Sequence, residues 1–127
     1  WSYETASAAK MVEFVKCAGS PTAVTVPLTS PGGIAFDGFN NLYYSDPAAG
    51  RVYRCKGVTT CTPFTQLFAD AIFINFDQGW KHLWIADFGS ATIYGLTKAG
   101  KTISVTPAVG GTSDPPLGIA PIPGSKY

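Results

Sequence analysis

One pattern occurs twice in the sequence, and this internal repeat constrains the fold more than any other feature. Residues 33–46 and 73–87 each contain a short apolar run ending in aspartate, a glycine-containing turn, an aromatic run and a closing aspartate. Each copy continues through a turn of small residues into a third strand-like run. Short runs of this kind bounded by glycine turns are typical of strands, so each copy predicts a strand–turn–strand–turn–strand unit.

Further short strands are expected on both sides of these units. No segment longer than a turn combines helical periodicity with a cap, so the chain is predicted to be all-β. Four strands in a unit of about 40 residues is the period of a propeller blade. The expected strands are Ala9–Lys16, Thr22–Val26, Ile34–Phe36, Leu42–Ser45, Arg51–Arg54, Phe64–Phe68, Ile72–Phe76, His82–Ala86, Thr92–Leu96 and Lys101–Thr106, and Leu117–Ala120 copies a first strand.

The first unit resembles a known repeat family. Its motifs are Pro31-Gly-Gly-Ile-Ala-Phe-Asp-Gly, Asn41-Leu-Tyr-Tyr-Ser-Asp and Gly50-Arg-Val-Tyr-Arg, which together look like an NHL-type propeller repeat. The second unit and Leu117–Ala120 are similar to the wider NHL and gluconolactonase-like group of six-bladed β-propellers. The resemblance implies blades of four antiparallel strands. It implies no particular function, because such blades occur in enzymes, receptors and scaffolds alike.

The chain amounts to about three blade-lengths, one of which is divided between the two ends. We assign residues 1–28 to the later strands of a blade, 29–70 and 71–109 to two blades, and 110–127 to a first strand that residues 1–28 complete. When the C-terminal residue Tyr127 is read directly into Trp1, the joined segment is an aromatic run that ends in Glu4, like the second strands that end in Asp46 and Asp87. The division between the two ends therefore falls within a second strand.

A strand divided in this way leaves backbone groups without partners. A longer tandem polypeptide, completion by a neighbouring copy, or closure within one molecule would each satisfy them. Three blades fall below the usual four to eight, whereas two copies give six, and an open stack is the other option. We therefore expect an assembly of copies, either six-bladed or filament-like. The expected strand-completing residues are Trp1, Ser2, Tyr3, Lys126 and Tyr127.

The three cysteines indicate one local disulfide. Cys55 and Cys61 flank a turn-like insert that would bring them together across a hairpin, the alternative being two free thiols. The third cysteine, Cys17, is expected to be either a buried free thiol or a partner in a disulfide with another subunit. Zinc is not expected, because the thiols and the single histidine lack paired ligand spacing. A disulfide in a chain with few charges predicts an extracellular or cell-surface location.

Charge and hydropathy exclude several partners. Nine basic and eight acidic residues give a net charge of +1, which does not indicate a nucleic acid or an anionic membrane as partner. The apolar runs are far shorter than the roughly 20 residues of a membrane helix. No cofactor motif is present in the sequence.

Acidic residues close the second strands, and they suggest either a metal site or turn capping. Asp46, Asp87 and Glu4 recur once per blade, whereas an active site is normally unique, so capping is predicted. Likewise, Asp37 and Asp77 are expected to shape the turns after the first strands.

The resemblance to gluconolactonase-like enzymes implies a metal held near the propeller axis by carboxylates and an asparagine. The corresponding positions here are Gly32, Ile72 and Leu117, which cannot bind a metal, and Asn75 stands three residues late. His82 has no nucleophile motif beside it and is expected to lie at a strand end. We therefore expect no metal, no catalytic set and no enzyme activity.

The polar loops and the strand aromatics allow binding roles instead. Four threonines in the loops are candidates for O-linked sugars: Thr29, Thr59, Thr60 and Thr112. The alternative is that the loops are not glycosylated. Tyr43 and Trp84 alternate with their neighbours, so one set of aromatics faces the core and the other could stack on sugars or on a subunit. The sequence favours an extracellular, non-enzymatic, self-assembling scaffold whose partners are further copies. The alternatives are a glycan- or protein-binding module and a metal-dependent lactonase or hydrolase.

Overall fold

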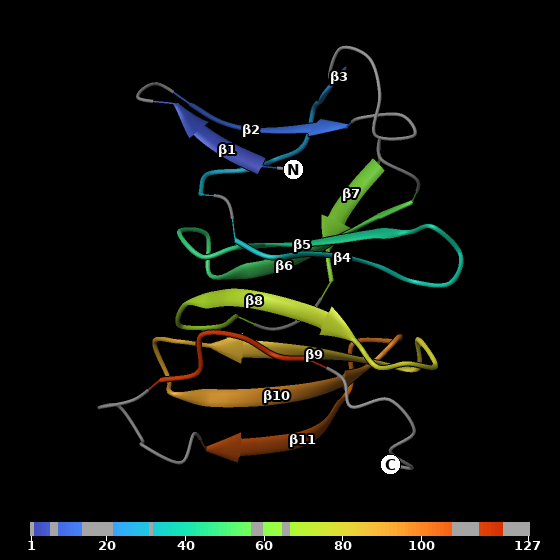
Figure 1. Ribbon diagram of the computed structural model, residues 1–127, viewed down its shortest axis with the longest axis vertical. Helices are drawn as coiled ribbons and strands as arrows, with labels where there is room; N and C mark the ends of the chain where they lie inside the picture. Colours follow the sequence, from blue (N-terminus) through green and yellow to red (C-terminus); the bar gives the residue numbers. More distant parts are fainter. Residues whose placement is uncertain are drawn as a thin grey trace.

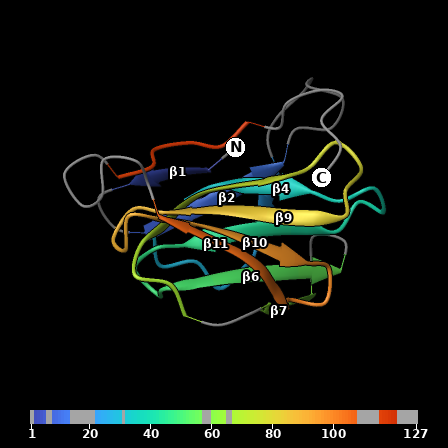
Figure 2. The same ribbon diagram turned by 90° about the horizontal axis from the view of Figure 1, so that it is seen from below.

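The computed structural model is all-β, as the sequence predicts. It describes residues 2–5, 8–13, 22–30, 32–56, 60–64, 67–107 and 115–120. These residues form strands and turns without a helix, so this part of the chain contains no helix that could cross a membrane. The strands belong to three antiparallel sheets that lie one above another in Figure 1, and Figure 2 shows the same sheets from below.

Each sheet follows the chain in order from one edge to the other. The N-terminal sheet contains β1 (Ser2–Thr5), β2 (Ala8–Glu13) and β3 (Thr22–Val24). The middle sheet contains β4 (Ile34–Phe36), β5 (Leu42–Asp46), β6 (Arg51–Lys56) and β7 (Thr60–Pro63). The C-terminal sheet contains β8 (Ala71–Phe76), β9 (His82–Asp87), β10 (Thr92–Thr97) and β11 (Thr102–Pro107).

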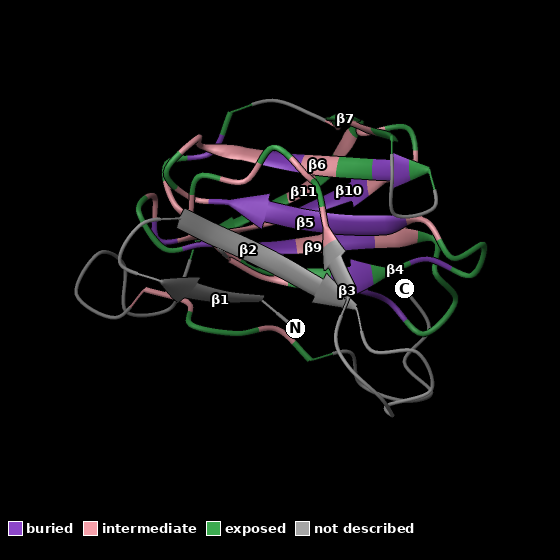
Figure 3. Ribbon diagram, turned by 90° about the horizontal axis from the view of Figure 1, so that it is seen from above, coloured by how far each residue is buried: buried purple, intermediate pink, exposed green. Residues whose placement is uncertain are grey.

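The main core lies between the middle and C-terminal sheets. Tyr43 on β5 is fully buried, and its ring makes edge-to-face contacts with Phe64 at 5.1 Å and Phe76 at 5.0 Å between centroids. Val52 and Leu83 are buried in the same cluster, and β5 and β9 appear purple over much of their length in Figure 3. Each such side chain stabilises the fold by about 1.5–3 kcal/mol, so this interface makes the two sheets one unit.

The two sheets approach most closely at their first strands. A Cβ atom on Gly33 would lie 2.7 Å from the backbone nitrogen of Ile74 and 3.2 Å from the Cα of Phe73. Neither atom can rotate away as a flexible side chain would. Glycine is therefore required just before β4, and the packing of adjacent sheets supplies the reason.

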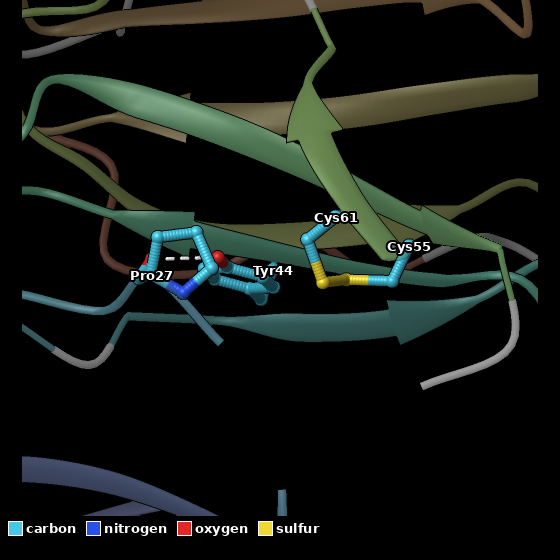
Figure 4. Close-up of a disulfide and its surroundings, with 4 residues drawn as sticks. All are labelled: Pro27, Tyr44, Cys55 and Cys61. Atoms are coloured by element: carbon cyan, nitrogen blue, oxygen red, sulfur yellow. Dashed lines mark hydrogen bonds between the residues drawn. A yellow bond between two sulfur atoms is a disulfide. The ribbon is translucent and has the colours of Figure 1, made fainter. Parts of the chain in front are cut away.

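The opposite face of the middle sheet packs against the segment that leads into it. Leu42, Tyr44 and Cys55 form a second buried cluster, covered by residues 24–28. The Tyr44 hydroxyl donates a 2.6 Å hydrogen bond to the carbonyl oxygen of Pro27, as Figure 4 shows. Residues 24–28 thus cover β5 and β6.

The structure confirms most of the expected strands, with ends shifted by one or two residues. Of the expected strand Ala9–Lys16, β2 contains residues 9–13, and residues 14–16 lie outside the described residues. The prediction of the fourth strand in the first unit is wrong, because β7 occupies Thr60–Pro63 and not Phe64–Phe68. Phe64 and Phe68 instead pack into the core from a connecting segment. Leu117–Ala120 was expected to copy a first strand, but residues 115–120 belong to no strand of the described structure. Those residues do lie beside β8, where the side-chain amide of Asn75 donates to the Ile119 carbonyl at 3.4 Å.

Candidate functional site

The recurring acids at the ends of the second strands hold turns together. Asp46 is buried, and its carboxylate accepts hydrogen bonds from the backbone N–H groups of Thr29 at 2.5 Å, Ser30 at 3.0 Å and Ala49 at 3.2 Å. It therefore connects the segment before β4 to the turn after β5. The predicted capping role is confirmed at this position.

Asp87 does the same in the C-terminal sheet. Its carboxylate accepts from the N–H groups of Ala69 at 3.0 Å and Asp70 at 2.6 Å, and from the Ser90 hydroxyl at 2.8 Å. These bonds engage both carboxylate oxygens. The described part of the chain contains no group of three or more His, Cys, Asp or Glu side chains arranged to hold a metal.

The single histidine forms a pair that resembles a catalytic dyad. Its Nδ1 lies 2.7 Å from Oδ2 of Asp77, at the turn between β8 and β9. The matching turn of the middle sheet contains the same contact, where the Asn41 amide donates to Asp37 Oδ2 at 2.8 Å. Because an asparagine makes the equivalent bond in a turn that is one residue shorter, we interpret His82 as a turn-closing residue.

Hydrogen bonds in these turns favour the charged form of each aspartate. Burial raises the pKa of Asp37, but hydrogen bonds from Asn41 and Phe39 outweigh it and hold the pKa below its usual value. Burial likewise raises the pKa of Asp77. Hydrogen bonds from Lys81 and His82 lower it by more, so the pKa of Asp77 also lies below its usual value. Both carboxylates therefore act as structural acceptors, as the sequence predicts for these turns.

The positions equivalent to the lactonase ligands carry no ligand chemistry in the structure. The backbone N–H of Gly32 donates to the Ser45 carbonyl at 3.2 Å, and Ile72 lies within β8. Leu117 is exposed, and the Asn75 side chain holds the segment around Ile119.

The predicted disulfide is present. Cys55 on β6 and Cys61 on β7 face one another in the strand register and are bonded, as drawn in Figure 4. Cys17 lies outside the described residues. Among the threonines named for glycosylation, Thr29 and Thr60 are exposed, while Thr59 and Thr112 also lie outside the described residues.

The proposed strand-completing residues are only partly visible. Ser2 and Tyr3 belong to β1, where they pair with Met11 and Lys10 of β2. Trp1, Lys126 and Tyr127 lie outside the described residues. The intended completion of a strand across the ends therefore stays a prediction.

The structure reveals a further feature that sequence reasoning missed, an exposed apolar face on β4. Ile34 and Phe36 are 38% and 49% exposed. Their equivalents in the next sheet, Ile74 and Phe76, are 2% and 4% exposed because the middle sheet covers them. We call Ile34 and Phe36 the leading face. The aligned repeat could have revealed this face, because Ile34 and Phe36 align with the same residue types at Ile74 and Phe76. Equivalent residues are expected to be equally buried, so exposure at one pair indicates a missing neighbour.

The far side of the C-terminal sheet is also open. Gly118 occupies the position that Gly33 has in the first unit, yet a Cβ atom there would meet nothing within 4 Å. Phe73, on β8, is 44% exposed. We call Phe73 and Gly118 the trailing face. Positions equivalent to those packed between the two sheets are thus exposed at β4, on the side of the middle sheet that residues 24–28 partly cover, and again beyond β8.

The comparisons with known proteins identify the fold. No protein-family model and no curated protein matches the chain. Among solved structures, a streptogramin B lyase matches with a TM-score of 0.67 at 18% identity, covering 81% of this chain and 35% of that chain. Virginiamycin B lyase from Staphylococcus aureus matches at 0.64 and 15%, covering 77% and 34%. Regucalcin from Agrobacterium tumefaciens, described as a calcium-binding protein, matches at 0.67 and 18%, covering 83% and 38%.

These neighbours are β-propeller proteins, so the chain has a β-propeller fold, and its sheets are blades. The chain spans about a third of the length of each of these solved structures. The identities are low, so the likeness concerns the fold and not the activity. The propeller part of the resemblance seen in the sequence is confirmed.

Proposed function

We propose that this chain is a non-enzymatic propeller-repeat scaffold that assembles with a second copy of itself through its leading and trailing faces. The observation that carries the proposal is the contrast between Ile34 and Phe36, which are exposed, and Ile74 and Phe76, which are buried at equivalent positions. The internal interface between the middle and C-terminal sheets is the template for the missing contact.

The repeat specifies how the two faces would meet. Within the chain, Gly33 lies against the backbone at Phe73 and Ile74. Moving that contact on by two units places Gly118 of one copy against the backbone at Gly33 and Ile34 of the other copy. The absence of a side chain at Gly118 leaves room for this approach, and Phe36 would be buried as Phe76 is.

Blade number supports a pair of copies. Two chains of about three blade-lengths give six blades, within the usual range of four to eight for closed propellers. In a closed ring each leading face meets a trailing face, so no apolar face is left open and growth stops. An open stack would leave one face of each kind exposed at its ends.

Two further observations support the non-enzymatic and extracellular parts of the proposal. The carboxylates of Asp46 and Asp87 are engaged by turn N–H groups, and His82 is equivalent to an asparagine, so these residues have structural roles. By contrast, the neighbours include lyases and a luciferin-regenerating enzyme, so other proteins with this fold are enzymes. The Cys55–Cys61 disulfide supports an oxidising location.

The proposal is tested by the mass of the particle in solution. We expect light scattering after size exclusion to give twice the chain mass for the unaltered protein. Ile34→Asp and Phe36→Asp should each give the mass of one chain with an unchanged far-UV spectrum, because a charge on the leading face would be buried in the assembly. Leu67→Asp is the matched control, since Leu67 is 64% exposed and lies outside both faces.

The assembly part fails if the unaltered protein remains a single chain at the highest concentration that stays soluble. It also fails if Leu67→Asp separates the copies as effectively as Phe36→Asp. Turnover of a lactone with added divalent ions would contradict the non-enzymatic part.

A further inference from the structure

A groove on the middle sheet lies apart from the leading and trailing faces. It has a volume of about 550 Å³ and is lined by Phe39, Asn41, Arg54, Lys56, Thr60 and Thr62. Arg54 and Lys56 alternate with Cys55 along β6, so they share the face of Val52, which points toward the C-terminal sheet. The groove therefore opens at the rim between two sheets of one chain, and it does not need a second copy.

The disulfide braces the hairpin that forms this groove. Cys55 pairs with Cys61, Arg54 with Thr62 and Lys56 with Thr60 across β6 and β7. The four lining side chains thus flank the two half-cystines and project from the face opposite to them. A covalent link between the strands fixes two cations opposite two hydroxyl groups, which lowers the entropy lost on binding a ligand.

The lining side chains of the groove carry positive charge only, although the Asp37 carboxylate lies near Lys98. None of the described lining residues is acidic, and within the described structure neither Arg54 nor Lys56 forms an ion pair. A third cation reaches the same place, since the Lys98 ammonium lies 4.9 Å from the centre of the Phe39 ring. The nearby Asp37 carboxylate is engaged by the N–H groups of its own turn.

An exposed aromatic ring stands beside these cations. Phe39 is 78% exposed, and its ring is therefore open to solvent beside the lining cations. The Asn41 amide and the two threonine hydroxyls supply hydrogen bonds at the other walls. Cations, hydroxyls and an aromatic face together match a ligand with an acidic group, several hydroxyls and an apolar ring face.

We propose that this groove binds an acidic saccharide, with its carboxylate or sulfate on Arg54 and Lys56 and one sugar ring against Phe39. Guanidinium groups bind such oxyanions through two parallel hydrogen bonds, and the threonines and Asn41 are placed to bond sugar hydroxyls. Three cations are too few for a nucleic acid, for which several phosphate contacts are needed. This site is independent of the proposed assembly, because neither the leading nor the trailing face contributes to it.

The proposal is tested by calorimetric titration of the full chain with a galacturonic acid trimer. The methyl-esterified trimer has the same rings without the charges, and sodium sulfate has charge without a ring. We expect the acidic trimer to bind at least about tenfold more tightly than the ester, and more tightly than sulfate. Equal binding of trimer and ester, or binding of sulfate as tight as that of the trimer, would overturn the proposal, as would preferential binding of a single-stranded oligonucleotide.

Variants locate the site. Arg54→Gln should weaken trimer binding about tenfold, whereas Arg51→Gln, on the same strand but outside the groove, should leave it unchanged. Phe39→Ala should weaken the trimer and leave sulfate unaffected. Reduction of the disulfide should weaken trimer binding with the far-UV spectrum retained. An equal loss in Arg51→Gln and Arg54→Gln would place the binding elsewhere.

Discussion

A matched pair of glycine substitutions tests the account of how adjacent blades pack. Gly33→Ala places a methyl group 2.7 Å from the Ile74 nitrogen and 3.2 Å from the Phe73 Cα. Both are backbone atoms, so the two sheets themselves must move apart. Gly118→Ala is the same chemical change at the equivalent position of the third unit, where the methyl group meets nothing within 4 Å.

The size of the difference follows from overpacking. Inserting a methyl group into a tightly packed interface costs about 1–3 kcal/mol, against a total of about 5–15 kcal/mol for a domain. For a chain of 127 residues each kcal/mol lowers Tm by about 4 °C, so Gly33→Ala should lower it by about 4–12 °C. Gly118→Ala should change the free energy of unfolding by less than about 0.5 kcal/mol, as exposed substitutions do.

The assay is urea unfolding followed by fluorescence, with both substitutions introduced into Phe36→Asp. That background keeps self-association out of the measurement, which would otherwise make stability depend on concentration. The reasoning is refuted if Gly33→Ala is no less stable than Gly118→Ala, because the sheets would then not approach as closely at β4 and β8 as described.

Three other predictions concern the turns and the core. Asp87→Ala should lower the free energy of unfolding by about 3 kcal/mol, since two backbone N–H groups and a hydroxyl lose a charged acceptor, and urea titration would show this. Asp37 and Asp77 have lowered pKa values, so their contribution to stability is complete above the unfolded-state pKa near 4 and is lost as pH falls through the folded-state values. Unfolding measured from pH 6 down to pH 2 should therefore show a steeper loss for the parent than for Asp37→Asn; parallel curves would contradict this. The Tyr43 hydroxyl is buried, and the Asp37 carboxylate is the one described group that acts on it as a hydrogen-bond acceptor without meeting full hydrogen-bond geometry. Tyr43→Phe should therefore change stability by no more than about 1 kcal/mol, whereas a larger loss would show that the hydroxyl and Asp37 are strongly bonded.

The sequence predicts those parts of the fold whose signals are local and repeated. The turn-closing acids Asp46 and Asp87 recur with the same neighbours, and the disulfide joins cysteines separated by a short hairpin. The sequence does not predict the position of β7, because its residues contain no apolar run. Thr60–Pro63 forms an exposed edge strand, whereas the apolar Phe64 and Phe68 belong to a connecting segment that packs into the core.

The candidate sites depend on information that a single strand pattern does not contain. The groove requires knowledge that Arg54 faces Thr62 across β6 and β7, which is a matter of register. The leading face requires the burial of Ile34 to be compared with that of Ile74 in the folded chain. Repeats show which positions are equivalent, and only the structure shows which of them lack a neighbour.

The central claim is that the leading face of one copy meets the trailing face of another. It is tested most directly by mixing Ile34→Cys with Gly118→Cys, each in a Cys17→Ser background, and treating the mixture with a short bifunctional maleimide. The account predicts a cross-linked pair of chains in the mixture and none with either variant alone. Cross-linking of Ile34→Cys to itself, or an assembled particle that yields no cross-link in the mixture, would contradict it.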